Sequence, residues 1–364
     1  MKYPVNVPAF ADVPLSMSVL SDFTAAIATG RELSPSEVEQ AAAMLAEPVE
    51  SDAVKGDFLT ALARRGETAE EVAGFARYFL DRAVNPGVEQ WASKSVDIVG
   101  TGGDHSGGFN ISSLVVLVLA SAGVKVMKHG NRGVTSKCGS ADLLAALGYD
   151  VQAPPEKVRA ALDELGYAFF FAPAYHPAFR HVAPVRKALA AQGQRTVFNV
   201  LGPLLNPGRP SSTLLGCHSL PWVEKLSAAL HLLGRGSGLV CHGIIDRDRG
   251  IDEITTATVN RVRGFGRFRA IDGDWQAFEF GLEAAPFGEL QGGDVATNLA
   301  IAEALMTGRG PKGLVDSIAF NAGIAMWLVG HSAAISDGIA FSRELLTSGD
   351  VARKVAQTRA FFGS

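Results

Sequence analysis

The strongest constraint on the fold is an alternation of short β-rich runs with segments of helical periodicity. The predicted strands cover residues 96–99, 124–127, 167–171, 213–217 and 238–242. Helical periodicity lies between and after them, as in residues 142–147, 155–165 and 222–233. Because parallel strands need long crossover connections, this alternation predicts an α/β unit with a mostly parallel central sheet and helices around it.

The segments on either side of this unit have a different character. Residues 17–83 repeat apolar residues at helical spacing and offer Ser or Thr as helix N-caps, which predicts a small all-helical domain. We place that domain at residues 1–85, joined by a helical segment near 180–210, and the α/β domain at 86–364. Residues 261–280 are typical of one or two antiparallel edge strands, and the segments 294–307, 314–329 and 339–362 are helical in pattern.

Composition excludes several classes of protein. The net charge of -4 disfavours a dedicated nucleic-acid binder, which usually presents a basic face. Cys138, Cys217 and Cys241 are odd in number and lack zinc-site spacing, so neither a disulfide framework nor a zinc centre is indicated. The most apolar run, residues 111–126, is shorter than a membrane-spanning helix, and no secretory signal is evident. We therefore expect a soluble cytoplasmic protein without a membrane partner.

A glycine-rich stretch, DIVGTGGDHSGGFNISS, follows the first predicted strand at residues 97–113. Its glycines can adopt positive φ and leave backbone N–H groups open to an anion. Asn110, Ser112 and Ser113 then begin the next helix, where free N–H groups favour phosphate. We call residues 100–110 the glycine loop. The alternative that it only reverses the chain stays open, because the stretch matches neither the Walker pattern nor the dinucleotide fingerprint.

Two further groups of polar residues follow other predicted strands. The stretch KHGNRGVTSKCGS, at residues 128–140, combines the cations Lys128, Arg132 and Lys137 with three glycines. Two such loops at neighbouring strand ends would hold a phosphorylated sugar from both sides. The acidic pair Asp252 and Glu253, in GIDE, provides hard oxygen ligands suited to Mg²⁺. Solvated surface charge is the alternative interpretation of both groups.

These motifs together resemble the anthranilate phosphoribosyltransferases of tryptophan biosynthesis. The resemblance covers nearly the whole chain and rests on GTGGD, FNIS, KHGNR, SKCGSAD, HPAFRHVAPVR, TVFNVLGPLLNP and GIDE, in that order. It implies a homodimer with a small helical domain and a larger α/β domain, the active site lying between them. It also implies a Mg²⁺-dependent pentosyltransferase that moves the phosphoribosyl group of 5-phosphoribosyl-1-pyrophosphate to the amine of anthranilate.

The resemblance implies a role for each matching residue. The phosphoribosyl pyrophosphate site would comprise Gly100, Gly102, Gly103, Asp104, Asn110, Ser112, Ser113, Lys128 and Ser140. The anthranilate site would comprise Gly100, His129, Asn131, His176, Arg186 and Pro203, with Arg186 facing the carboxylate. The metal ligands would be Ser112, Asp252 and Glu253. No residue is assigned as acid or base, and Lys128 would stabilise the transition state.

Two departures from the family pattern and two alternative functions complete the expectations. Relatives commonly carry Thr where this chain has Gly108, so we expect a looser glycine loop, and residues 190–194 lengthen a connection. Pyrimidine nucleoside phosphorylases share the architecture, but their glycine signature differs from GTGGD. A non-enzymatic relative that binds nucleic acid is disfavoured by the net charge and by the intact GIDE pair.

Overall fold

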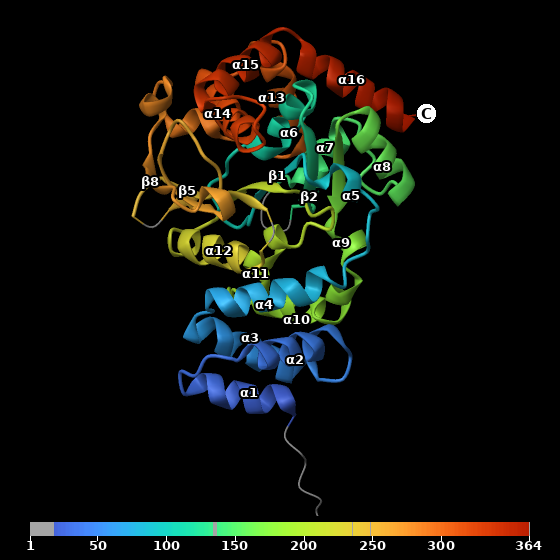
Figure 1. Ribbon diagram of the computed structural model, residues 1–364, viewed down its shortest axis with the longest axis vertical. Helices are drawn as coiled ribbons and strands as arrows, with labels where there is room; N and C mark the ends of the chain where they lie inside the picture. Colours follow the sequence, from blue (N-terminus) through green and yellow to red (C-terminus); the bar gives the residue numbers. More distant parts are fainter. Residues whose placement is uncertain (1–17, 134–136, 235, 248, 364) are drawn as a thin grey trace, which may run out of the picture.

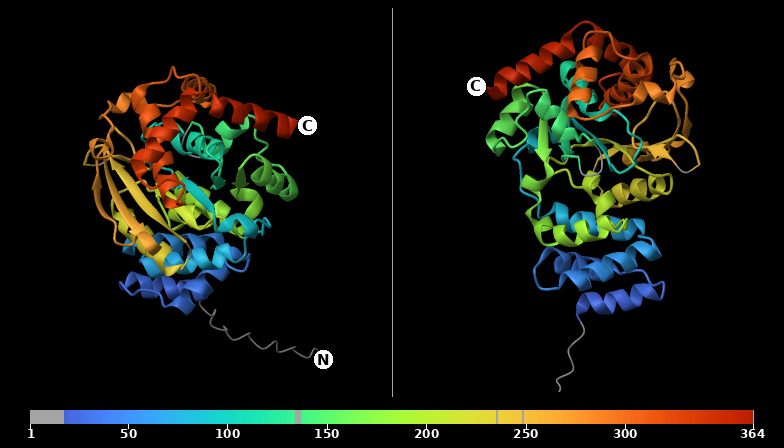
Figure 2. Two further views of the ribbon diagram at one scale, coloured as in Figure 1. Left: turned by 45° about the horizontal axis from the view of Figure 1, so that its top comes forward. Right: turned by 180° about the vertical axis from the view of Figure 1, so that it is seen from behind.

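The structure is a computed structural model that describes residues 18–133, 137–234, 236–247 and 249–363. A bundle of helices from the start of the chain is stacked against a larger α/β unit, and the sheet lies between that bundle and the last helices (Figures 1 and 2). Residue 17 of the predicted helical region and Ser136 of SKCGSAD lie outside the described residues. The predicted fold class is confirmed.

The N-terminal helices begin where the sequence places its caps. They are α1 (Val19–Ala28), α2 (Pro35–Ala46), α3 (Asp52–Arg65) and α4 (Ala69–Leu80). The hydroxyls of Ser34, Ser51 and Thr68 each accept a hydrogen bond from a first-turn N–H of the following helix. A cap of this kind satisfies one of the N–H groups that a helix start leaves without a partner.

The sheet of the described residues has the strand order β3-β2-β1-β4-β5-β7-β8, with β6 paired to β5. The strands are β1 (Ser95–Gly100), β2 (Lys125–Gly130), β3 (Tyr167–Phe171), β4 (Ser212–Gly216), β5 (Ser237–Ile244), β6 (Gly250–Ile251), β7 (Val259–Phe265) and β8 (Asp272–Trp275). The first five are parallel to one another, whereas β6, β7 and β8 pair antiparallel. Of the two predicted edge strands only β8 is an edge, because β7 lies between β5 and β8.

Helices cover both faces of this sheet. Those of the α/β unit are α5 (Glu89–Ala92), α6 (Ile111–Ser121), α7 (Ser140–Ala146), α8 (Pro155–Glu164), α12 (Pro221–Leu232), α13 (Val295–Leu305), α14 (Lys312–Leu328), α15 (Ile335–Thr347) and α16 (Asp350–Gly363). Short 3₁₀ turns are η3 (Gly266–Phe268), η4 (Ala277–Phe280) and η5 (Phe287–Leu290). The sequence predicted one helical segment over 339–362, but Gly349, at φ 86°, separates α15 from α16.

Alternate residues of the strands face two different apolar cores. Val96 and Ile98 of β1 pack with α6 and α14, whereas Val99 of the same strand joins a second cluster with α12 and the N-terminal helices. This alternation is the period-two pattern of a strand whose faces are both covered. The second cluster therefore connects the helical bundle to the sheet, and the division at residue 85 stays a prediction.

After β3 the chain leaves the sheet and returns to the helical bundle. This excursion, residues 172–205, contains α9 (Ala172–Tyr175), η1 (Pro177–His181), α10 (Ala183–Ala191), α11 (Phe198–Leu201) and η2 (Gly202–Leu204). Val182, Val185 and Leu189 belong to the bundle's apolar cluster. The buried ammonium of Lys55 in α3 donates to the backbone carbonyls of Leu45, at 3.2 Å, and of His181, at 3.3 Å. The excursion is thus fixed to the bundle by packing and by hydrogen bonds.

Within the described residues, no helix is both long and apolar enough to cross a membrane. The cytoplasmic location stays a prediction.

Candidate active site

Three strand ends meet where Asp252 follows β6. A Cβ placed on Gly100 would lie 2.3 Å from Asp252 Oδ2, and one placed on Gly216 would lie 1.7 Å from the Asp252 carbonyl oxygen. The Gly102 N–H donates to Asp252 Oδ2 at 2.7 Å. Gly100 and Gly216 are therefore glycines because Asp252 lies against their backbone, a reason that the sequence analysis did not identify.

The second acid of the pair holds the start of α6. The N–H of Ser112 donates to Glu253 Oε1 at 3.0 Å. The ammonium of Lys128 donates to the Ile98 carbonyl at 2.6 Å and to Ser112 Oγ at 3.2 Å. Lys128 is buried, and burial lowers its pKa, although the negative charges of Asp97, Glu253 and Asp252 act in the opposite direction. The predicted phosphate and metal residues are thus in direct contact with each other.

Negative charge is concentrated around this lysine. Burial raises the pKa of Glu253 to about 7 and raises that of Asp252 well above its usual value, with a further increase from the neighbouring Asp104. Burial also raises the pKa of Asp97 to about 6, and Asn206 Nδ2 donates to its Oδ2 at 2.8 Å. Among the residues described, no three His, Cys, Asp or Glu side chains form a ready-made metal cluster.

The glycine loop contains several residues in the left-handed backbone region. Gly102, Gly103 and Gly107 have φ near 70°, and His105, which is not glycine, has φ 56°. The loop ends in a fixed contact, because Gly108 forms an antiparallel bridge with Gln291 and the Phe109 N–H donates to the Leu290 carbonyl at 2.8 Å. The backbone at Gly108 is thus held by hydrogen bonds, and the expectation that Gly108 loosens the loop stays a prediction.

The two predicted phosphate loops lie side by side, because β1 and β2 are adjacent parallel strands. Asn110 Nδ2 donates to the Cys138 carbonyl at 3.1 Å, which connects the glycine loop to residues 137–140. Ser140 Oγ donates to the carbonyl of Asn131, an exposed residue, at 3.4 Å. Ser113 is fully buried, and its hydroxyl has no partner among the described residues. Ser113 thus faces the protein interior, whereas Asn110 and Ser140 form contacts between or within the two loops.

A second group of predicted residues forms an aromatic-walled site next to β2. The rings of His129 and His176 meet edge to face at 5.0 Å, and the His176 ring stacks on Phe179 at 5.6 Å. The Arg186 guanidinium lies 5.8 Å from the ring centre of Phe179 and 5.2 Å from that of Phe198. Segments far apart in the sequence thus bring two histidines and one arginine to a common site.

The hydrogen bonds of His129 define its tautomer. Its Nδ1 lies 3.1 Å from the carbonyl oxygen of Gly202, which can only accept, so Nδ1 carries the proton. The buried Nε2 has no partner in the described part of the chain, and neither ring nitrogen of His176 has one. Burial lowers the pKa of His129 to about 3 and that of His176 to about 4, so both are neutral at pH 7. Pro203, which is buried, follows Gly202 in η2.

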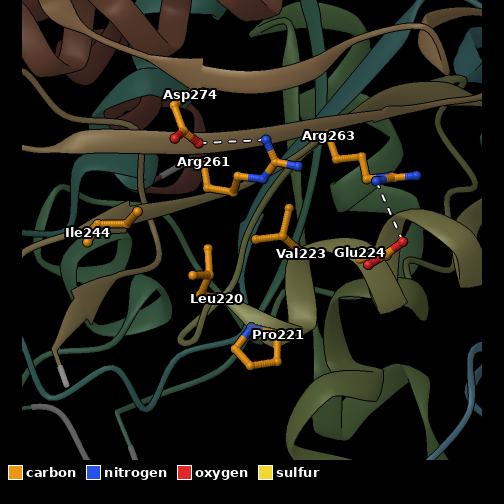
Figure 3. A pocket seen from close by; sticks show the side chains of 8 residues that line it. All are labelled: Leu220, Pro221, Val223, Glu224, Ile244, Arg261, Arg263 and Asp274. Atoms are coloured by element: carbon orange, nitrogen blue, oxygen red, sulfur yellow. Dashed lines mark ion pairs between the residues drawn. The ribbon is translucent and has the colours of Figure 1, made fainter. Parts of the chain in front are cut away.

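A hollow of about 510 Å³ lies elsewhere, between α12 and the antiparallel strands (Figure 3). Its two arginines are paired with acids: Arg261 lies 3.6 Å from Asp274 and Arg263 lies 3.6 Å from Glu224. Because these charges are neutralised locally, the hollow does not provide the basic surface that a nucleic-acid groove needs.

Comparisons with known proteins cover most of the chain. A glycosyl transferase family model for an α/β domain matches residues 92–352, and its helical bundle domain matches residues 21–83. The chain is 44% identical over 293 residues to the anthranilate phosphoribosyltransferase of Thermus thermophilus, covering 80% of this chain and 84% of that protein. It is 36% identical over 335 residues to that of Persephonella marina, covering 91% of this chain and 95% of that protein.

Solved structures of such enzymes share the fold. The crystal structure of anthranilate phosphoribosyltransferase from Thermus thermophilus superposes with a TM-score of 0.85 at 39% identity, covering 94% of this chain and all of that one. The Saccharomyces cerevisiae enzyme in complex with PRPP and Mg superposes with a TM-score of 0.82 at 26% identity, covering 96% of this chain and 99% of that one.

Replacing Gly100 by Ala should weaken substrate phosphate binding. The added Cβ would meet Asp252 Oδ2 at 2.3 Å, so the carboxylate must move away from the Gly102 N–H. We expect the dissociation constant for phosphoribosyl pyrophosphate with Mg²⁺ to rise by about tenfold or more, the effect of losing a charge-assisted hydrogen bond. Isothermal titration calorimetry measures this dissociation constant. Gly273→Ala is the matched control, because a Cβ there meets nothing within 4 Å; equal affinity in the two variants would contradict the prediction.

His176 should make the protein less stable as the pH falls. Its folded pKa of about 4 lies below the unfolded value of about 6.5, so the unfolded chain binds the extra proton between these values and stability is lost as the pH falls through them. From pH 7 to pH 5, the free energy of unfolding should fall by about 2 kcal/mol more in the wild type than in His176→Phe. Urea titrations at both pH values measure this difference. The exposed His331→Phe serves as control and should follow the wild type.

Proposed function

The chain belongs to the anthranilate phosphoribosyltransferase family, and from that premise we propose how its residues carry out the family's reaction. In the reaction, the amino nitrogen of anthranilate forms a bond to C1 of the ribose. The bond from C1 to the pyrophosphate oxygen breaks with its electron pair on the oxygen, and the amine nitrogen loses one proton. The products are the N-phosphoribosyl amine and pyrophosphate.

The observation that carries the assignment of the acceptor site is the environment of Arg186. Its half-buried guanidinium lies beside the rings of Phe179 and Phe198, which pack edge to face on each other, and no acidic side chain pairs with it in the described residues. A buried cation without a counterion is costly, and a carboxylate ligand removes that cost through a bidentate, charge-assisted contact. The two phenylalanines provide the apolar faces that an aromatic acid needs. We therefore assign the anthranilate carboxylate to Arg186.

The histidines are suited to holding the amine. Since Nδ1 of His129 carries the proton, its buried Nε2 presents a lone pair that can accept a hydrogen bond from the amine N–H. Because burial lowers the pKa of His129 to about 3, it orients the amine without taking up its proton in the ground state. Fixing the nitrogen near C1 can supply a large part of the rate, because the reaction then becomes effectively unimolecular. Gly100, Asn131, His176 and Pro203 would complete this site.

The phosphate side would be formed by the two adjacent loops. We assign the pyrophosphate and ribose phosphate to Gly100, Gly102, Gly103, Asp104, Asn110, Ser112, Ser113, Lys128 and Ser140. The contacts support some of these more than others. Lys128 and Ser112 are hydrogen-bonded to each other at the start of α6, which brings a cation and a hydroxyl together there. Ser113, which is buried among apolar residues of α6, has the weakest support.

The residues present fit a bound Mg²⁺. Asp252, Glu253 and Ser112 offer hard oxygen donors, and the pKa values of both acids are raised by burial, with a further increase from repulsion by the negative charge of Asp104. A divalent cation would remove that repulsion. When bound, Mg²⁺ neutralises charge on the pyrophosphate oxygens. Asp104, whose Oδ2 accepts from the Asp252 N–H at 3.3 Å, would add a third carboxylate beside these two metal ligands.

Lys128 would act on the charge that develops during the reaction. Positive charge grows on the sugar as the leaving group departs, and negative charge grows on the pyrophosphate. The lysine ammonium is already fixed by Ile98 and Ser112, so it needs no reorganisation to stabilise the leaving oxygens. The side chains around C1 therefore bind and orient, and no residue is assigned as a catalytic acid or base.

The alternatives are not favoured. Pyrimidine nucleoside phosphorylase-like transfer gives no use for the unpaired Arg186 of the described residues, because a pyrimidine base has no carboxylate. Nucleic-acid binding is disfavoured by the net charge of -4 and by the paired arginines of the 510 Å³ hollow.

We also propose that the chain acts as a homodimer, as the family resemblance implies. Light scattering at micromolar concentration tests this, and a species of the chain's own 38.2 kDa alone would contradict it.

The function itself is tested by mixing the purified protein with anthranilate, phosphoribosyl pyrophosphate and Mg²⁺ and following the loss of anthranilate fluorescence. We expect turnover that stops on chelation of the metal. Release of free base from thymidine and phosphate would instead favour the phosphorylase alternative.

Arg186→Ala should damage anthranilate recognition selectively. Loss of the guanidinium removes a charge-assisted partner of the carboxylate, so KM for anthranilate should rise by roughly ten- to a hundredfold. The calorimetric dissociation constant for phosphoribosyl pyrophosphate should stay within about twofold. Lys187→Ala removes an exposed cation next to Arg186 and should change neither value. Equal weakening of both substrates by Arg186→Ala would mean that Arg186 has a structural role instead.

A further inference from the structure

The glycine loop needs support from outside itself. Gly102, Gly103, His105 and Gly107 all have positive φ, a conformation that costs backbone freedom at the glycines and strain at the histidine. Inside the loop, Ser106 donates to Asp104 at 2.8 Å, but this contact does not reach residues 101–103. The shape of the first half of the loop therefore depends on contacts with other elements.

One such contact comes from the excursion into the helical bundle. Arg195, in the connection between α10 and α11, donates from its guanidinium to the Gly103 carbonyl. A Cβ on Gly103 would lie 3.5 Å from the same nitrogen, so the guanidinium stands directly over the residue. No carboxylate pairs with Arg195 in the described chain.

A second contact comes from the end of β4. The N–H of His218 donates to Thr101 Oγ1 at 3.0 Å, and His218 Nδ1 lies 3.2 Å from the same oxygen. Thr101 Oγ1 lies 3.2 Å from the Gly102 carbonyl, to which it donates. The carbonyls of Gly102 and Gly103 thus each accept a hydrogen bond, from Thr101 and from Arg195 respectively.

Peptide geometry then fixes the direction of the next N–H groups. In a trans peptide, the C=O and the following N–H point in opposite directions. Holding the Gly102 and Gly103 carbonyls toward Thr101 and Arg195 turns the N–H groups of Gly103 and Asp104 away from them. Neither N–H has a hydrogen-bond partner among the described residues, whereas the Gly102 N–H is already taken by Asp252.

A cavity of about 180 Å³ lies beside these contacts. Its lining includes Arg195 and His218 together with Glu67 and Trp222, and it contains none of the residues assigned above to substrates or metal. Because space borders both side chains here, hydrogen bonds rather than close packing must hold the loop from this side. Removing one of them should therefore change the loop without disturbing the core.

We propose that Arg195 and His218 are positioning residues that aim the N–H groups of Gly103 and Asp104 at a phosphate of the substrate. Arg195 acts directly on the Gly103 carbonyl, and His218 acts through Thr101. The identification of that anion as the pyrophosphate rests on the proposed function. The shape of the loop itself does not rest on it.

The test compares Arg195→Ala with Arg195→Lys and with the control Lys187→Ala, which removes an exposed cation from α10. Arg195→Ala should speed amide hydrogen exchange in residues 100–110 of the substrate-free protein, and should weaken phosphoribosyl pyrophosphate binding by about tenfold with Mg²⁺ present. KM for anthranilate and the melting temperature should match the control. Arg195→Lys, which keeps one donor, should recover part of the affinity.

Thr101→Val should also speed amide exchange in residues 100–110 and weaken phosphoribosyl pyrophosphate binding. It removes the hydroxyl that joins His218 to the Gly102 carbonyl. Unchanged loop exchange in Arg195→Ala would overturn the proposal, as would faster exchange with unchanged substrate affinity. If the wild type fails to bind phosphoribosyl pyrophosphate at all, the proposed function fails. The exchange measurement still decides whether Arg195 shapes the loop.

Discussion

The close approach of Asp252 to the bare backbone of Gly100 and Gly216 is the constraint on which the site depends. It brings an acid from the antiparallel hairpin of β5 and β6 between the ends of two parallel strands. The same carboxylate binds the Gly102 N–H, so the acidic pair and the glycine loop are one structure. A side chain at either glycine would separate them, and Asp252 and Glu253 would then lose their fixed place next to the glycine loop.

The charges around this contact support the proposed metal site. Asp97, Asp252 and Glu253 surround one buried ammonium, that of Lys128, and burial raises the pKa of all three acids. An excess of buried negative charge is unfavourable in a low-dielectric interior, and a divalent cation corrects it. The bound pyrophosphate would then be balanced by that cation and by Lys128 together. Positioned charges of this kind stabilise a departing anion without reorganisation.

Much of the fold could be predicted from the sequence, because local residue patterns determine local structure. The five parallel strands and the N-caps Ser34, Ser51 and Thr68 follow from periodicity and cap chemistry. The two loops are neighbours because adjacent parallel strands share an edge. Contacts between segments that lie far apart in the sequence could not be predicted. Nothing near Gly216 in the sequence indicates that Asp252 covers it, and the Arg195 contact with Gly103 has no local signal.

The excursion of residues 172–205 explains how the helical bundle takes part in the proposed active site. The sheet edge offers N–H groups, hydroxyls and acids, which suit phosphate and metal, but it offers few apolar surfaces for an aromatic acid. By leaving the sheet after β3, the chain packs Phe179 and Phe198 into the bundle and places Arg186 beside them. Before the chain returns to β4, the same excursion also places Arg195 in contact with the glycine loop. One continuous segment, held by the bundle's core, therefore contacts both proposed substrate sites, and we infer that the packing of the bundle sets their relative position.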